Sequence, residues 1–291
     1  MLFRSTTTLT NGTLDLNSKT LSTGLFSSSN ANTRTLAFGS SGQIALTGSG
    51  ATIWNVGNAS TSTISGTGTV VCNYSGSVGT RTIANTPDTG ATGVSFSITA
   101  GTDTVVFTAS DLVNNIDFTG FSGTWTNVAL SVYGNLTTST GMTVSAGIGA
   151  VTFAATSGTK TLTTNGKTWD FPVTFDGVGG TWQLVDALTV GSTRTTTLTN
   201  GSLNLNGKTL TTGLFSSAVT NTRTLTSGVG GNITITGSGT TVYTVTSTNL
   251  SVDTNPTVSL TYSGSTGTRT DRKSTRLNSS HTDISRMPSS A

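Results

Sequence analysis

The 291-residue chain contains no glutamate, a single cysteine and only four prolines, and just 9% of its residues are charged. Ordinary globular domains carry about 25% charged residues. Lysine is also scarce, whereas threonine, serine, glycine and asparagine are abundant. Because the abundant residues favour strands and turns over helices, the composition predicts an all-β protein.

The missing residue types also limit the chemistry. Cys72 lies in the apolar run 69–72 and has no second cysteine to pair with, so we expect a small buried hydrophobic side chain. The only histidine is His281, close to the end of the chain, which excludes zinc sites and histidine-dependent nucleophiles from the rest. No glycine-rich phosphate-binding motif and no apolar run of roughly 20 residues occurs, so neither a cofactor nor a membrane span is predicted.

Residues 271–291 differ from the rest in composition and period. The run from Asp271 to His281 resembles the translation of a common short-read sequencing adapter, and the run from Ser285 to Ala291 resembles its far end. Both pieces stand in the order and spacing that the adapter would give. We therefore predict a non-native tail at 271–291 that adds nothing to the fold, and expect residues 1–270 to be a segment of a longer protein.

The tail also carries most of the net charge. It holds four of the fourteen Lys and Arg residues and two of the eleven Asp residues, which leaves ten basic against nine acidic residues in 1–270. Because that balance is nearly neutral, no nucleic-acid partner is predicted.

An internal repeat organises the remaining chain. Residues 8–56 recur without a gap at 197–245, with 31 of 49 positions identical, and the similarity continues to 82 and 270 with an offset changed by one residue. The spacing of the apolar residues is kept, so we expect equivalent leucines such as Leu16 and Leu205 to point inward. A repeat of this kind indicates a stack of similar structural units.

The local pattern predicts what those units are. Short alternating runs such as 13–16 and 43–46 end at glycine or asparagine, which is typical of strands joined by tight corners. Shorter echoes inside the long repeat recur at intervals near multiples of about 20 residues. We predict a parallel β-helix, or β-solenoid, with coils of about 19–23 residues, an inner ladder of Leu, Ile and Val, and outward threonines. The alternative is a string of tandem β-sandwiches of about 95 residues each.

One segment is rich in both acidic and aromatic residues. Its members are the candidate glycan-binding residues: Trp169, Asp170, Asp176, Trp182 and Asp186. A polysaccharide-cutting enzyme would need two carboxylates at a set separation. Carboxylates that meet in a groove with exposed aromatic rings would favour such an enzyme. Asp176 precedes Gly177, however, and Asp-Gly at a corner is typical of a turn, so we assign no catalytic residue. The glycine-rich run that follows is solitary, whereas calcium-binding β-rolls repeat theirs in tandem, and no metal site is predicted.

The Thr- and Asn-rich segments 9–17 and 198–206 resemble the repeats of large bacterial surface adhesins and of phage tail-fibre proteins. The resemblance covers residues 5–270 in composition and pattern. It implies an extracellular stalk, on a cell surface or virion, that binds surface glycans or a host cell surface. We therefore predict a structural and adhesive segment and no enzymatic activity, with a tailspike-like polysaccharide depolymerase as the alternative.

Overall fold

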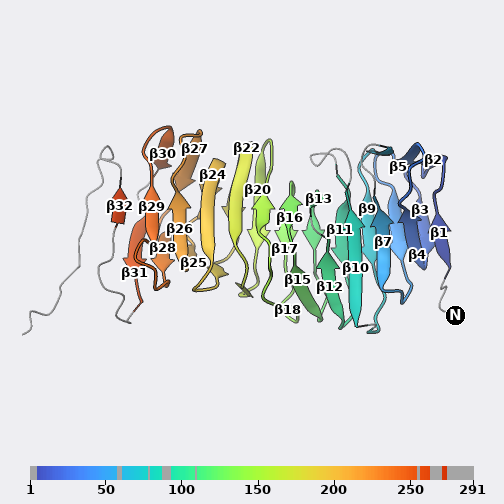
Figure 1. Ribbon diagram of the computed structural model, residues 1–291, viewed down its shortest axis with the longest axis horizontal. Coiled ribbons are helices and arrows are strands. Elements are labelled where there is room, and N and C mark those ends of the chain that lie inside the picture. Colours follow the sequence, from blue (N-terminus) through green and yellow to red (C-terminus); the bar gives the residue numbers. More distant parts are fainter. Residues whose placement is uncertain are drawn as a thin grey trace, which may run out of the picture.

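The computed structural model describes residues 5–57, 61–77, 79–86, 93–108, 110–253, 256–262 and 271–273. All regular elements in these ranges are strands, which pair in parallel and wind into a rod of about 11 turns (Figure 1). Nothing in the described ranges is a helix long and apolar enough to cross a membrane. The predicted β-solenoid is confirmed. The tandem-sandwich alternative is wrong, because each strand pairs with strands one turn before and after it and not with its neighbour in sequence.

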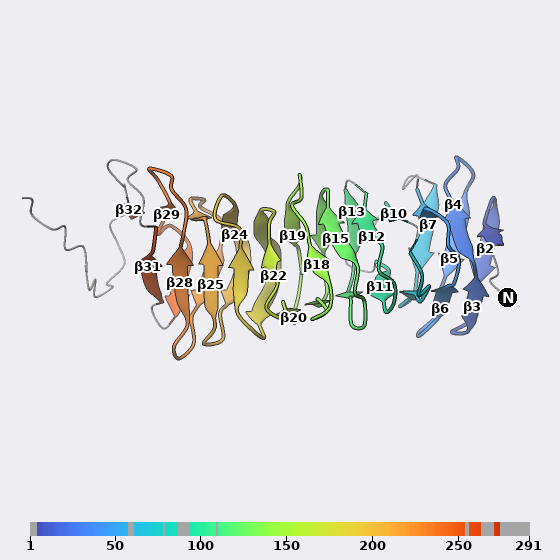
Figure 2. The same ribbon diagram turned by 90° about the horizontal axis from the view of Figure 1, so that it is seen from below.

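Most of the described turns carry three strands or strand segments, so the rod has three faces, seen from two sides in Figures 1 and 2. The first face consists of two stacks, β1 (Thr6–Thr8), β4 (Leu25–Ser28), β7 (Thr52–Val56), β10 (Thr80–Asn85), β12 (Thr104–Phe107), β15 (Thr124–Asn127) and β18 (Thr143–Val144), then β21 (Thr168–Trp169), β23 (Leu188–Val190), β25 (Thr209–Thr212), β28 (Asn232–Ile235) and β31 (Thr257–Leu260).

The second face begins with the stack β2 (Gly12–Asp15), β5 (Arg34–Ala37) and β8 (Ser62–Ser65). It continues with β13 (Asp111–Val113), β16 (Leu130–Val132), β19 (Val151–Phe153), the first parts of β22 (Val173–Leu184) and β24 (Thr195–Asn204), β26 (Leu214–Ser217), β29 (Tyr243–Val245) and β32 (Asp271–Lys273).

The third face is continuous along the rod. It consists of β3 (Thr20–Thr23), β6 (Gln43–Leu46), β9 (Thr69–Cys72), β11 (Ser95–Ile98), β14 (Ile116–Asp117), β17 (Leu136–Thr137), β20 (Thr159–Thr163), the second parts of β22 and β24, β27 (Arg223–Thr226) and β30 (Leu250–Asp253). The long strands β22 and β24 each bend around a corner and so belong to two faces.

The length of a turn varies along the rod. Thr6 pairs with Leu25 of the next turn, an interval within the predicted range, whereas Thr52 pairs with Thr82, which is a much longer interval. The extra residues lie in corner loops, where an insertion leaves the hydrogen-bonded strands in place because loop closure costs little and the loop faces solvent. The predicted coil length therefore holds for turns such as the first and is exceeded in others.

Stacked apolar side chains fill the interior. On the third face, Ile44, Val70, Phe96, Ile116 and Leu136 are successive partners and all are buried. Leu16 and Leu205 are also buried, as predicted, and so is Cys72. A single turn could not bury such residues, so each turn depends on its neighbours for a closed core.

Asparagine and glycine make the corners that the pattern predicts. Asn17, Asn165 and Asn206 have positive φ, and so do Gly12 and Gly201. Side chains with a β-carbon rarely adopt this conformation, which glycine and, less readily, asparagine tolerate.

The two copies of the repeat lie on different faces of the rod. β5 and its equivalent β27 occupy the same place in sequence, but β5 lies on the second face and β27 on the third. The segment between the copies therefore does not make a whole number of turns. As a result, equivalent outward side chains of the two copies point in different directions around the axis.

The first three residues of the predicted tail form strand β32, which pairs with β29. Parallel pairing uses only main-chain groups, so any backbone that lies along a sheet edge can make it. Residues 274–291 lie outside the described residues, and the non-native origin of 271–291 stays a prediction.

Candidate functional site

The two tryptophans of the predicted glycan-binding group lie inside the rod. Trp169 and Trp182 are 0% and 1% exposed. Both rings contact Phe153, with centroids 6.1 and 4.5 Å away. The structure thus brings the two indoles together in the core, where they stabilise stacking between turns and offer no ring to a ligand in solvent.

The three aspartates of the group lie in one turn but at three separate corners. Asp170 follows β21 on the first face, Asp176 lies where β22 bends from the second face to the third, and Asp186 lies between β22 and β23. The turn signal at Asp176 is thus realised as a bend within β22. In the described parts of the chain, no group of three His, Cys, Asp or Glu residues could hold a metal ion.

Each of these carboxylates has a partner in a neighbouring turn. Asp170 accepts a hydrogen bond of 2.7 Å from Nε of Arg194, in an ion pair that is partly exposed. Asp186 accepts a bond of 2.7 Å from the backbone N–H of Thr164. Asp176 accepts a bond from the side-chain amide of Asn200. The carboxylates therefore link successive turns.

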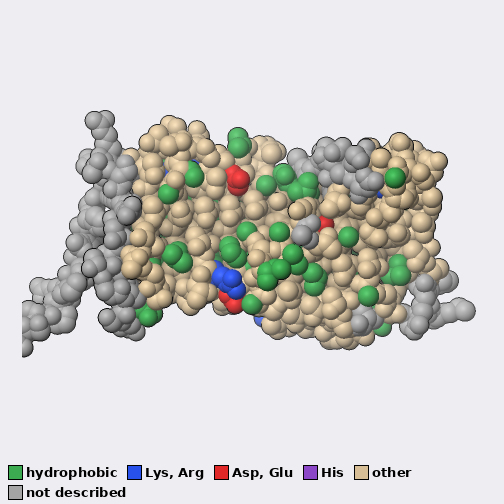
Figure 3. Space-filling view, in the orientation of Figure 1, with side chains coloured by type: hydrophobic (Ala, Val, Ile, Leu, Met, Phe, Trp, Pro, Cys, Tyr) green, Lys and Arg blue, Asp and Glu red, His purple; other side chains and the backbone are tan. Residues whose placement is uncertain are grey.

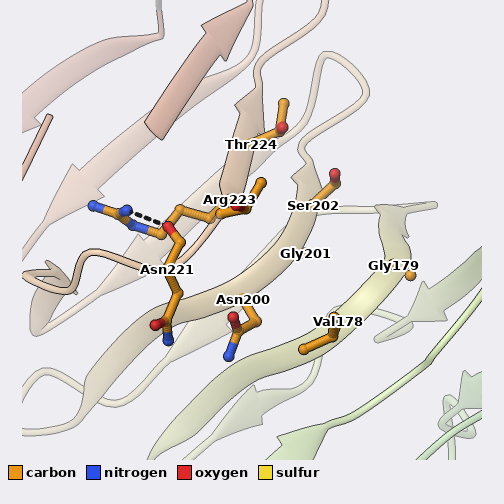
Figure 4. Close-up of a pocket in the computed structure, with 10 residues that line it drawn as sticks. Val178, Gly179, Asn200, Gly201, Ser202, Asn221, Arg223 and Thr224 are labelled. Atoms are coloured by element: carbon orange, nitrogen blue, oxygen red, sulfur yellow. Dashed lines mark hydrogen bonds between the residues drawn. The ribbon is translucent and has the colours of Figure 1, made fainter. Parts of the chain in front are cut away.

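A groove runs beside the bend that holds Asp176. It has a volume of 370 Å³ and crosses three successive turns at the same corner. Its lining is Val178, Gly179, Gly180, Asn200, Gly201, Ser202, Asn221, Thr222, Arg223 and Thr224. Figure 4 shows Asn200 between Val178 and Asn221, one residue from each turn. The volume lies at the lower end of the range for small-molecule sites.

The groove is lined by three glycines, by Asn, Ser and Thr side chains, by one exposed valine and by Arg223. Val178 is 68% exposed, while amides and hydroxyls of Asn, Ser and Thr surround it. These side chains can both donate and accept hydrogen bonds. The same chemistry extends beyond the groove, since the face in Figure 3 consists mostly of uncharged polar side chains and backbone.

The Arg223 side chain supports the wall of the groove, and its guanidinium is engaged in hydrogen bonds within the protein. Its side chain is buried, and Nε donates to Oγ of Ser217 at 2.6 Å. The two terminal nitrogens donate to the backbone carbonyls of Ser217, Asn221, Thr246 and Thr248. Burial lowers the pKa of this guanidinium. These five acceptors are neutral oxygens on both sides of a corner, so Arg223 fastens one corner loop to the next turn.

The first copy of the repeat contains the same arginine arrangement. Nε of Arg34 donates to Oγ of Ser28 at 2.7 Å, and its terminal nitrogens donate to the carbonyls of Ser28, Asn32 and Gly57. Sequence reasoning missed these buried arginines. The available signal was a serine six residues before an arginine, retained in both copies while neighbouring loop residues changed.

Other buried ionisable groups lie away from the groove. Arg81 and Asp103 form a buried ion pair of 2.6 Å, and burial raises the pKa of nearby Cys72 to about 12. Burial also raises the pKa of Asp111 to about 6, although its carboxylate accepts bonds from the backbone N–H groups of Asn85 and Thr108. These groups hold the core and corners together.

Comparisons with protein-family models, with curated proteins and with solved structures gave no match.

Proposed function

We propose that this chain is a structural and adhesive rod that acts outside the cell, on a cell surface or virion, and binds neutral surface glycans at the groove around Val178. The observation that carries the proposal is the groove across three stacked corners, with its amide and hydroxyl side chains around the exposed Val178. Sugars present hydroxyl groups that both donate and accept hydrogen bonds, as the amides and hydroxyls of the groove do. The parallel strand pairing between successive turns makes the rod stiff, and a stiff rod holds such a site at a fixed distance from the point where it is anchored.

The placement of the acidic residues supports the rod over the depolymerase alternative. Glycosidic bond cleavage needs two carboxylates about 5–10 Å apart on either side of the bond. Asp170, Asp176 and Asp186 lie at different corners, and each is engaged by a group of an adjacent turn. Only Asp176 lies beside the groove. In this proposal the carboxylates shape the corners and take no part in chemistry.

A double variant in the groove and a valine variant outside it test the binding site. Val178→Ser, combined with Asn221→Ala, should reduce retention on immobilised neutral cell-surface polysaccharide by tenfold or more (roughly 1.4 kcal/mol). Val229→Ser should leave it unchanged, because Val229 is 98% exposed and lies outside the groove lining. Equal retention by the parent chain and both variants would contradict the proposed site.

The absence of turnover is tested separately. We expect no release of reducing ends from these glycans, and replacing Asp170, Asp176 and Asp186 together by Asn should preserve binding, because Asn keeps the turn-forming side chain without its charge. Release of reducing ends that the triple variant abolishes would favour the depolymerase.

A further inference from the structure

Part of the first face carries a regular array of hydroxyl side chains. Along β10, β12 and β15 the residues Arg81, Val105 and Trp125 are buried, so the residues on either side of each point outward. With β18, these outward residues form two columns across four successive turns. The eight residues, here called the hydroxyl array, are Thr80, Thr104, Thr124 and Thr143 in one column and Thr82, Val106, Thr126 and Ser145 in the other. All but Val106 carry a hydroxyl group.

The strand pairing fixes the spacing of the array. Thr80 is the direct partner of Thr104, and Thr104 is the direct partner of Thr124, without a shift of register. Paired strands lie about 4.8 Å apart, and alternate residues of one strand lie about 6.7 Å apart, so the side chains stand on a two-dimensional grid with these periods. Threonine is branched at the β-carbon, which restricts the rotation of its hydroxyl group about χ1. The sheet therefore holds the hydroxyls in a fixed and repeating pattern.

The chemistry of the array indicates what kind of partner it fits. None of its eight positions is Lys, Arg or Asp. Thr80 and Thr143 are exposed, and the other six are half-buried. Each hydroxyl can donate one hydrogen bond and accept two, whereas the threonine methyl groups between them make none. The array offers no charge and no aromatic ring, so the partner that matches it is uncharged, donates and accepts hydrogen bonds equally, and repeats in two dimensions.

We propose that the hydroxyl array binds the surface of ice. Ice is an uncharged solid in which every water molecule donates and accepts hydrogen bonds, and its oxygen atoms repeat in two dimensions at intervals comparable with those of the array. Water held by the hydroxyls at this spacing joins the lattice, and the methyl groups fill the spaces between the bonded positions. One hydroxyl contributes little, because liquid water competes for the same bond. The solenoid holds the whole array rigidly, however, so little side-chain freedom is lost on binding.

This function is separate from glycan binding at the groove. The groove lies at the corner between the second and third faces, where β22 bends, whereas the array lies on the first face over β10, β12, β15 and β18. The groove variant Val178→Ser, Asn221→Ala should therefore leave ice binding unchanged.

Growth of a single ice crystal in a solution of the full chain tests the proposal. The chain should hold the freezing temperature of the crystal below its melting temperature, a gap called thermal hysteresis, and should shape the crystal into facets. Thr104→Tyr combined with Thr124→Tyr should lose most of the hysteresis, because tyrosine suits an outward strand position but its ring keeps the array away from the ice. The matched control is Thr152→Tyr combined with Thr174→Tyr. These threonines are also half-buried partners in adjacent turns, but they lie on the second face, so the control should keep the hysteresis of the parent chain.

A milder variant keeps the test independent of folding. Thr104→Ser combined with Thr124→Ser retains both hydroxyls but removes the methyl groups that restrict them, so it should reduce the hysteresis while the circular dichroism melt stays that of the parent. The proposal is overturned if the parent chain changes neither the freezing temperature nor the crystal shape, or if the array and control variants lose hysteresis equally. Retention of the parent chain on crystalline cellulose, lost in the array variant and without any effect on ice, would also overturn it, because the array would then bind an ordered polysaccharide.

Discussion

Replacing Arg223 by methionine tests how the corners of the rod are held together. The guanidinium donates to Oγ of Ser217 and to four backbone carbonyls, two of which belong to Thr246 and Thr248 in the next turn. Methionine fills a similar volume but donates no hydrogen bond. The change therefore leaves five acceptors around a buried side chain without their donor.

The expected loss follows from these contacts. A hydrogen bond to a charged group contributes about 1.5–3 kcal/mol, and a buried acceptor left unpaired costs about 1–3 kcal/mol. Water can reach some carbonyls at a corner, so the sum is reduced and we expect a loss of roughly 3–5 kcal/mol. Arg194→Met is the matched control, because Arg194 also lies between two threonines but forms a partly exposed ion pair with Asp170. Such pairs contribute about 0–1 kcal/mol.

Urea unfolding and hydrogen exchange measure the two losses. Arg223→Met should lower the urea midpoint strongly and speed exchange in the loops on either side of β27, whereas Arg194→Met should change both little. A loss below about 1 kcal/mol for Arg223→Met, or equal losses for both variants, would refute the view that buried arginines fasten the corners.

Three further predictions address the register, a buried carboxyl and the tail. Leu205→Asp should unfold its own and adjacent turns, whereas Asn204→Asp should hardly change the thermal midpoint, since only Leu205 is fully buried. Equal midpoints for the two variants in circular dichroism melts would show that the assigned register is wrong by one residue. Because the pKa of Asp111 is about 6 in the folded protein and about 3.9 when unfolded, its contribution is fully present below about pH 4 and lost as the pH rises through 6. The free energy of unfolding should therefore fall by on the order of 3 kcal/mol as the pH rises from about 3 to about 7, which is measured as a lower urea midpoint. Asp111→Asn should flatten the profile, and an unchanged slope in the variant would contradict this. Deleting residues 271–291 should leave the thermal midpoint in place, and a drop of more than a few degrees would show that the tail is native and packed.

Part of the candidate site was accessible from the sequence and part was not. The groove runs beside the bend that holds Asp176, and glycan binding by this segment stays a prediction. Aromatic rings near carboxylates are typical of sugar sites, which is why Trp169 and Trp182 are candidates, but both rings lie in the core. The remaining groove residues come from the two following turns, and no local pattern connects them.

The sequence by itself determined the class of fold and the direction of most side chains. Alternation with a period of two is a local property, so the inward positions of Leu16 and Leu205 follow from their neighbours, and the repeat shows that the units stack. Only the tertiary structure decided which corners lie above one another. That depends on the summed lengths of the loops, which vary from turn to turn, as the unequal intervals from Thr6 to Leu25 and from Thr52 to Thr82 show. For that reason the two repeat copies lie on different faces, three aspartates of one turn are kept apart, and Arg223 meets the carbonyls of the following turn.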